Sequence, residues 1–172
     1  EMLRLIDEEI KAARKRKPAA ITLKMNSLSD EDLIQKLYEA ARAGVQLKLI
    51  IRGIYCMYSE HKKFEIPVRA ISIVDEYLEH ARVWVFHNRG KEKVYISSAD
   101  WMLRNLEHRV EVTCPVWNDE LKMELKEILN IQLQDNVKAR WLDNQLNNEY
   151  VTTTRKKIRS QVETYNYLYK KT

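Results

Sequence analysis

The chain has 172 residues with only three Gly and three Pro, which suits one domain with its own core and excludes collagen-like or extended low-complexity architecture. No stretch approaches the roughly 20 consecutive apolar residues that a membrane-spanning helix needs. The formal net charge of +5 is concentrated at the C-terminal end, because residues 152–172 hold six Lys and Arg against one Glu.

This basic end favours a polyanionic partner such as nucleic acid, an acidic membrane surface or a phosphate polymer. A solvated helix face explains the same pattern. The two cysteines, Cys56 and Cys114, form neither a metal-ligand nor a disulfide pattern, so we expect a reducing, cytoplasmic location and an inert core role for Cys114. The chain opens within a predicted helix, and we expect it to be a fragment of a longer polypeptide.

The first half of the chain predicts a helix, a strand, a second helix and a second strand. Leu3, Ile6 and Ile10 recur at helical spacing over residues 2–16. Residues 19–25 read as a strand, Ser29 begins a capping box, and Gly44 is a natural end of the helix that follows. Residues 45–51 form the next strand. This order is typical of a βαβ unit with parallel strands.

The second half predicts short elements joined by polar loops. The pattern indicates strands over residues 68–73, 83–86, 93–96 and 109–116, a short helix over 74–80, and a hairpin turn at Asn88-Arg89-Gly90. Asn118 or Asp119 caps a long helix, and the end of the chain carries one or two more. We therefore expect an α/β fold with a mixed, mostly parallel sheet. Residues 1–140 form the domain, and residues 141–172 form a basic helical extension of it.

Residues 78–111 gather polar side chains at the ends of predicted strands, where a rigid scaffold presents them to a ligand. His80 is the best single candidate, since an imidazole can attack phosphorus or donate a proton near pH 7. Arg82 lies two residues on and would share a face with it. A structural histidine is the alternative. The supporting candidates are Ser98, Asp100, Asn105 and Glu111.

Arg52 lies before Gly53 at the carboxyl end of a predicted parallel strand, the edge where open α/β sheets place ligands. Its guanidinium can bind two phosphate oxygens at once. Alternatively, Arg52 pairs with Asp75 or Glu79. The sequence contains neither a P-loop nor a GxGxxG motif, and neither an HExxH nor a paired-cysteine metal site, so a phosphate would be held by Arg and imidazole.

With these residues identified, the sequence resembles the C-terminal domain of the bacterial polyphosphate kinases of the first family, in order and over nearly its whole length. The motifs that carry the resemblance are Lys17-Pro18-Ala19, Leu23-Lys24-Met25-Asn26-Ser27-Leu28, Ala43-Gly44-Val45, Leu49-Ile50-Ile51-Arg52-Gly53-Ile54, Ala70-Ile71-Ser72-Ile73-Val74-Asp75, Tyr77-Leu78-Glu79-His80, Tyr95-Ile96-Ser97-Ser98-Ala99-Asp100-Trp101-Met102, Arg104-Asn105-Leu106, Arg109-Val110-Glu111-Val112 and Asp135-Asn136-Val137-Lys138-Ala139-Arg140.

The resemblance implies a phospholipase D-like fold and reversible transfer of the terminal phosphate of ATP to polyphosphate through a phosphohistidine. That histidine and the Mg²⁺ ligands would lie on a preceding domain of the same polypeptide, absent here. His80 would be the second active-site histidine, acting as a general acid or a phosphate ligand, and Arg52 would contact nucleotide phosphate. The resemblance also implies a homo-oligomeric full enzyme, without a specific nucleic-acid partner, in the cytoplasm or peripherally at the inner membrane.

Three departures from the family pattern qualify the resemblance. A phospholipase-type HxKx4D motif would place Lys and Asp where this chain has Arg82 and His87, which argues against an independent nuclease or phospholipase. The loop at residues 55–60 lacks the family's usual Pro-Gly, and Glu76 stands where a basic residue is common. A nucleic-acid-binding or nuclease module remains the alternative function, and a scaffold domain with a degenerate site is a third.

Overall fold

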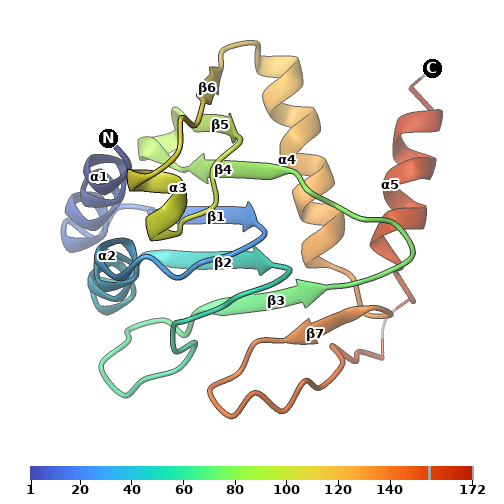
Figure 1. The fold of residues 1–172 in the computed structure, drawn as a ribbon, viewed down its shortest axis with the longest axis horizontal. Coiled ribbons are helices and arrows are strands. Elements are labelled where there is room, and N and C mark those ends of the chain that lie inside the picture. Colours follow the sequence, from blue (N-terminus) through green and yellow to red (C-terminus); the bar gives the residue numbers. More distant parts are fainter. Residues whose placement is uncertain (155, 172) are drawn as a thin grey trace.

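A computed structural model describes residues 1–154 and 156–171. Arg155 and Thr172 of the predicted basic extension lie outside the described residues. One seven-stranded sheet runs through the molecule in the order β6-β5-β4-β1-β2-β3-β7, with helices packed against it (Figure 1). The elements in chain order are α1 (Met2–Arg14), β1 (Ala20–Met25), α2 (Glu31–Arg42), β2 (Gln46–Ile51), β3 (Arg69–Ile73), β4 (Arg82–Phe86), the 3-10 turn η1 (Asn88–Gly90), β5 (Lys93–Ser97), α3 (Leu103–Glu107), β6 (Thr113–Val116), α4 (Asp119–Leu133), β7 (Ala139–Trp141) and α5 (Ser160–Tyr169).

The sheet is mixed, as predicted, but it is not mostly parallel. β1 pairs in parallel with β2, and β2 with β3, whereas β4 pairs antiparallel with β1, β5 with β4, β6 with β5, and β7 with β3. The predicted turn at Asn88–Gly90 is confirmed, and a connection this short can only join antiparallel strands. The βαβ pattern holds for the central strands, and the hairpin and the returning chain supply the antiparallel ones.

Two apolar clusters bury the two faces of the sheet. On one face, Leu23 and Leu49 of the central strands pack with Ile6 of α1 and Leu37 of α2 in a single cluster. On the other face, residues of β2 to β5 pack with Leu129 and Leu133 of α4. The alternation of side chains along β1 therefore places Thr22 and Lys24 on the α4 face. No helix among the described residues is long and apolar enough to cross a membrane.

The prediction of a helix over residues 74–80 is wrong. Residues 74–81 form an irregular link between β3 and β4, in which Val74, Tyr77 and Leu78 are exposed. Tertiary hydrogen bonds to α5, described below, hold this link in a non-helical path. The helix cap also differs, because the side chain of Asp30, not of Ser29, accepts the hydrogen bond from the Leu33 amide that begins α2. Gly44 does follow that helix, with the positive φ of 85° expected there.

The C-terminal third holds the other differences. The strand predicted over residues 109–116 begins at Thr113, and Cys114 is exposed rather than in the core because β6 is an outer strand of the sheet. β7 was not predicted; it pairs with β3 across the predicted boundary between residues 140 and 141. Val151, beyond that boundary, packs in the same cluster as Leu129. The predicted extension therefore shares the core of the domain.

Candidate active site at the carboxyl edge of the sheet

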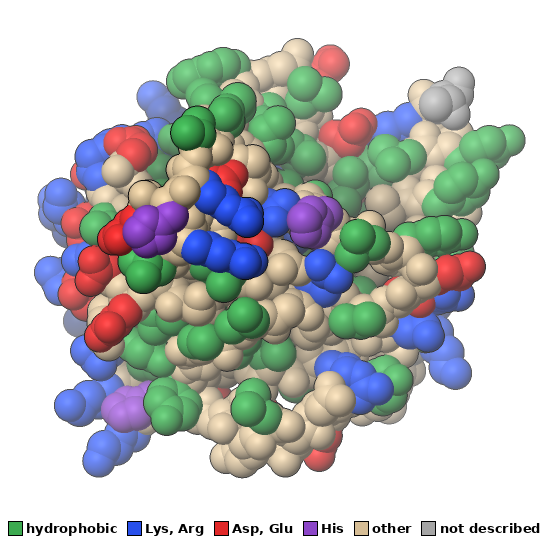
Figure 2. Space-filling view, in the orientation of Figure 1, with side chains coloured by type: hydrophobic (Ala, Val, Ile, Leu, Met, Phe, Trp, Pro, Cys, Tyr) green, Lys and Arg blue, Asp and Glu red, His purple; other side chains and the backbone are tan. Residues whose placement is uncertain are grey.

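The candidate site lies at the edge where β1 and β2 end, β4 begins and the chain leaves β5 (Figure 1). This edge brings Asn26 after β1, Arg52 after β2, Arg82 at the start of β4, and Ser98 after β5. These positions are far apart in sequence, and the antiparallel entry of β4 is what places Arg82 beside the others. On the face viewed in Figure 2, a group of Lys and Arg side chains lies between two histidines.

Asp100 is the centre of the site's hydrogen-bond network and is 3% exposed. Its Oδ1 accepts hydrogen bonds from the backbone amides of Asn26 and Ser27 at 2.8 and 3.2 Å and from Arg82 Nε at 3.2 Å. Its Oδ2 accepts from Arg82 Nη2 at 3.1 Å. Burial disfavours the ionised carboxylate, but these donors outweigh that effect and hold the pKa of Asp100 below its usual value. Asp100 is thus a fixed anion that orients Arg82.

His80 is exposed at the end of the link between β3 and β4. Arg82 Nη1 donates to the His80 carbonyl oxygen at 2.9 Å and lies 3.3 Å from His80 Nδ1. A guanidinium nitrogen can only donate, so Nδ1 is assigned as the acceptor and a neutral ring carries its proton on Nε2. In this tautomer, His80 can donate a hydrogen bond from Nε2 to a ligand.

Arg52 is held from the side of β1. Its Nη2 donates to the side-chain oxygen of Asn26, and its Nε is buried with no hydrogen-bond partner among the described residues. The alternative pairings of Arg52 with Asp75 or Glu79 are not formed, because those carboxylates bind Arg159 and Lys24 respectively. Arg52 is half-buried and is held by Asn26, so its guanidinium is fixed at the edge.

Glu111 gathers a second group of predicted site residues. Ser98 Oγ donates to its Oε2, and Asn105 Nδ2 donates to its Oε1 at 2.6 Å. The hydrogen bond from Ser98, then that from Asn105, lowers the pKa of Glu111, and the charge of Arg82 acts in the same direction. Glu111 therefore ties the loop after β5 to α3 and faces the same cation as Asp100.

A chain of hydrogen bonds connects Arg52 to His80 through Asn26, Asp100 and Arg82. The structure thus brings the predicted residues to one edge, but Arg52 and His80 share no direct contact. Four residues that support the edge through hydrogen bonds were not predicted as functional: Lys24, Glu79, Gln132 and Gln161. The sequence signal that could have identified this group is Lys24, a charged residue within the buried strand β1.

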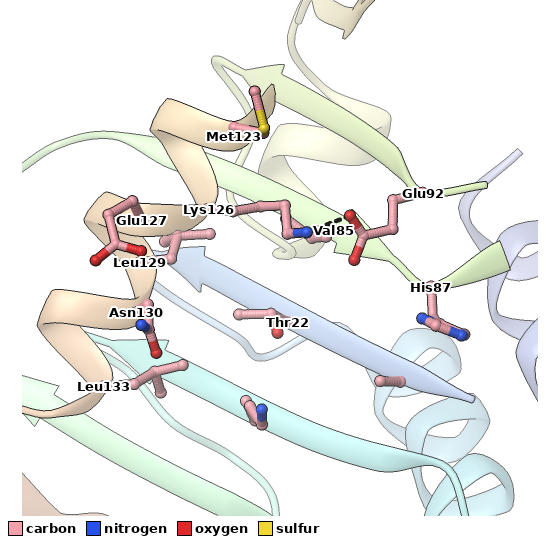
Figure 3. Close-up of a pocket in the computed structure, with 12 residues that line it drawn as sticks. Thr22, Val85, His87, Glu92, Met123, Lys126, Glu127, Leu129, Asn130 and Leu133 are labelled. Carbon is pink, nitrogen blue, oxygen red and sulfur yellow. Dashed lines mark hydrogen bonds and ion pairs between the residues drawn. The ribbon is translucent and has the colours of Figure 1, made fainter. Parts of the chain in front are cut away.

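A cavity of about 570 Å³ on the α4 face contains none of the predicted site residues. It lies between the sheet and α4, and Lys126 pairs there with Glu92 (Figure 3). His87 lines this cavity from the opposite end of β4 to Arg82. The candidate active site is therefore the exposed edge rather than this cavity.

The described residues of the edge do not fit a resident metal ion. They contain no group of three or more His, Cys, Asp or Glu residues that could hold one. The two carboxylates nearest the site, Asp100 and Glu111, are already engaged by Arg82, Ser98 and Asn105. The edge is suited to binding an anion instead.

Comparison with known proteins agrees with this arrangement. Residues 1–161 match the family described as polyphosphate kinase C-terminal domain 2. The chain belongs to this family. The resemblance seen in the sequence is thereby confirmed.

Relatives in the polyphosphate kinase family are similar over almost the whole chain. Polyphosphate kinase from Vibrio cholerae is 48% identical over 98% of the chain, and that from Escherichia coli K12 is 44% identical over 95%. Each match covers 24% of the relative, so the chain spans about a quarter of these proteins' length. The crystal structure of polyphosphate kinase from Porphyromonas gingivalis superposes with a TM-score of 0.95 and 46% identity, covering 99% of this chain and 26% of that one.

More distant structures show the fold of this polyphosphate kinase domain. NucT from Helicobacter pylori and the phospholipase D family member Nuc from Salmonella typhimurium superpose with TM-scores of 0.54 and 0.55, each at 14% identity. Each match covers 78% of this chain and about nine-tenths of the neighbour, at 90% and 89%. The phospholipase D-like fold predicted from the resemblance is confirmed.

Proposed function

We propose that this domain supplies one half of the active site of a polyphosphate kinase, which reversibly transfers the terminal phosphate of ATP to polyphosphate. The observation that supports this proposal best is the arrangement of the edge, where Asn26 holds the half-buried Arg52 and Arg82 holds the exposed His80. Two such donors, anchored by an ionised aspartate, suit the oxygens of a phosphate chain.

In the proposed reaction, a histidine of the preceding domain attacks the terminal phosphorus of ATP. A P–N bond forms, the bond to the bridging oxygen breaks, and ADP leaves with the electron pair. Reversal on the end of a polyphosphate chain lengthens that chain. Such transfers depend on positioning and on stabilising charge on the phosphoryl oxygens. Arg52 binds phosphate oxygens of the nucleotide. As a neutral ring, His80 donates a hydrogen bond from Nε2 to a phosphate. As an imidazolium ion it gives a proton to the leaving oxygen, and in that form its Nδ1 carries a proton and no longer accepts from Arg82.

Mg²⁺ enters this proposal with the nucleotide. Its protein ligands are expected on the preceding domain, since the carboxylates of this edge are engaged with Arg82, Ser98 and Asn105. When bound, Mg²⁺ would neutralise phosphate charge that Arg52 and His80 leave uncompensated.

The test uses the full-length enzyme that contains this domain. His80→Ala and Arg52→Ala should each lower ATP-dependent polyphosphate synthesis by about 100-fold or more, because each removes a donor to transition-state charge. The matched controls His61→Ala and Arg42→Ala lie on the surface away from the edge and should keep near wild-type rates. A rate close to wild type in either edge variant would remove that residue from the site.

A second test concerns the isolated 172-residue chain, which should make no polyphosphate because the proposed nucleophile lies elsewhere. Clear polyphosphate synthesis by this chain alone would refute the proposal that the domain supplies only one half of the active site.

The nuclease alternative rests on the fold shared with NucT and Nuc. Arg82 in place of the motif's Lys, and His87 in place of its Asp at the far end of β4, weaken it. A salt-titrated binding assay separates the two, since we expect polyphosphate to bind more tightly than single-stranded DNA at every salt concentration.

A further inference from the structure

The link between β3 and β4, residues 74–81, carries His80 without any helix or strand of its own. Its side chains at Val74, Tyr77 and Leu78 are largely exposed, so packing does not fix its path. An exposed link of this kind is normally among the more mobile parts of a fold. Here, however, its alternate residues 75, 77 and 79 all bind the start of α5.

Arg159 and Gln161 make these contacts. Arg159 donates from Nε and Nη2 to the two oxygens of Asp75, at 2.8 Å each. The Gln161 side chain accepts from the Tyr77 amide at 3.0 Å and donates to the Tyr77 carbonyl at 2.8 Å. Gln161 Nε2 also donates to Glu79 Oε1 at 3.2 Å. Gln161 thus pairs with the link as a neighbouring strand would, with both donor and acceptor used.

Glu79 joins the same link to the interior. Its Oε2 accepts from Lys24 of β1, which is 7% exposed, and from Gln132 of α4. Gln132 in turn accepts from Lys24 at 3.0 Å. Lys24 is buried, and Glu79 is the carboxylate that pairs with it there. The residue before His80 is therefore held from three elements at once.

The start of α5 is itself firmly attached to the domain. Ser160 is fully buried, and its amide donates at 2.7 Å to Asp135 just after α4. The Ile158 amide donates to the Asn136 side chain at 2.7 Å, and the Asn136 amide donates to the Ile158 carbonyl at 3.0 Å. Arg159 and Gln161 thus extend from a fixed base, although much of α5 beyond them is exposed.

We propose that Gln161 and Glu79 are positioning residues for His80: α5 clamps residues 74–81 so that His80 is presented at the carboxyl edge in a single arrangement. This inference rests on the proposed role of His80. It assigns to the C-terminal helix a function in phosphoryl transfer that the basic composition of residues 152–172 alone does not indicate. On this view Arg159 is engaged with Asp75 and is not free to bind a polyanion.

The experiment compares three variants of the full-length enzyme. Gln161→Glu keeps the size of the side chain but removes its donor and sets a second carboxylate beside Glu79. Gln161→Asn keeps the amide but is too short to reach both Tyr77 and Glu79. Gln35→Glu makes the same chemical change as the first variant at an exposed position on α2 and is the matched control.

For Gln161→Glu near pH 8 we expect about a tenfold lower kcat, a KM for ATP within about twofold of wild type, and faster hydrogen exchange in residues 74–81. The charged groups facing this position are Glu79 from the link and Lys24 from β1, and Glu79 disfavours ionisation of the new carboxyl. As the pH falls toward about 6, the new carboxyl takes up a proton and regains a donor, so the ratio of variant to wild-type kcat should rise several-fold. Gln161→Asn should be impaired without this recovery.

These measurements separate failure of the positioning role of α5 from failure of the proposed function of His80. If Gln161→Glu matches Gln35→Glu in kcat and exchange while His80→Ala is inactive, the clamp is overturned and the function stands. If His80→Ala is fully active, the proposed function falls, and the clamp with it. If Gln161→Glu does not fold, Gln161→Asn decides the question by the same kcat and exchange measurements.

Discussion

Arg82 donates to both carboxylate oxygens of Asp100, from Nε to Oδ1 at 3.2 Å and from Nη2 to Oδ2 at 3.1 Å. The same Oδ1 accepts the amides of Asn26 and Ser27. One buried carboxylate therefore joins the end of β1, the start of β4 and the segment after β5. The edge that holds the candidate site owes its shape to this ion pair, because each partner satisfies the other's buried charge.

Asp100→Asn should lower the free energy of unfolding of the 172-residue chain by about 3–5 kcal/mol, since it removes the carboxylate that is ion-paired and hydrogen-bonded to the largely buried Arg82 guanidinium. Urea unfolding followed by circular dichroism measures this loss. Asp32→Asn, on the exposed first turn of α2, is the control and should cost less than about 1 kcal/mol. Equal losses in the two variants would contradict the structural role of Asp100.

Acid should destabilise the folded chain through the same group. The folded-state pKa of Asp100 lies below its unfolded value, so its stabilisation is complete above the unfolded pKa of about 3.9 and is lost as the pH falls through the folded pKa. The Tm of the wild-type chain should therefore fall below about pH 4, and that of Asp100→Asn should fall less steeply. Parallel curves for the two proteins would show that Asp100 carries no pH-linked stability.

The link at residues 74–81 shows why sequence reasoning identified the candidate site but not its support. The strand ends, and hence Arg52, His80 and Asp100, follow from local apolar patterns and from the resemblance. The path of the link depends on Arg159 and Gln161, more than 80 residues later, since the contacts span 82 to 84 positions. No local periodicity contains such a contact, so a short helix was predicted instead.

The predictions for the outer strands of the sheet were wrong for a related reason. β7 has only three residues, and its strand character comes from pairing with β3. Cys114 lies in an apolar stretch that predicts burial, but β6 is the last strand of the sheet and leaves it exposed. In both cases the position of a strand within the sheet decides the outcome, and composition does not encode it.

Gly53→Ala should disturb the site from beneath Arg52. A Cβ at this position would lie 3.0 Å from the Asn26 carbonyl oxygen, which already accepts the Gly53 amide at 2.7 Å. Because this neighbour is backbone, we expect a loss of about 1–2 kcal/mol in the free energy of unfolding and a higher KM for ATP in the full-length enzyme. Gly90→Ala is not a useful control, since its φ of 86° adds strain. Ser98→Ala is the control instead, because it changes another residue of the same edge. If Ser98→Ala raises the KM for ATP as much as Gly53→Ala does, the effect of Gly53→Ala is not specific to Arg52.

Asp135→Ala should loosen both the fold and the His80 link. The Asp135 side chain is fully buried; its Oδ1 accepts the amides of Val137, Lys138 and Ala139 at 2.9, 2.7 and 3.0 Å, and its Oδ2 accepts that of Ser160 at 2.7 Å. Removing the carboxylate leaves these four amides without their acceptor, in two buried and two partly buried hydrogen bonds, so the free energy of unfolding should fall by at least about 3 kcal/mol. Since Ser160 begins α5, hydrogen exchange in residues 74–81 should also quicken.

Asp7→Ala is the control for this prediction, because it breaks a surface ion pair with Lys36 and should cost less than about 1 kcal/mol. Thermal unfolding and exchange measured by mass spectrometry on the two variants check both effects. An Asp135→Ala chain that is destabilised as expected but keeps wild-type exchange in residues 74–81 would show that the base of α5 does not transmit order to His80. The coupling would then have to come from Lys24 and Gln132 through Glu79, which are the contacts that remain on the interior side of the link.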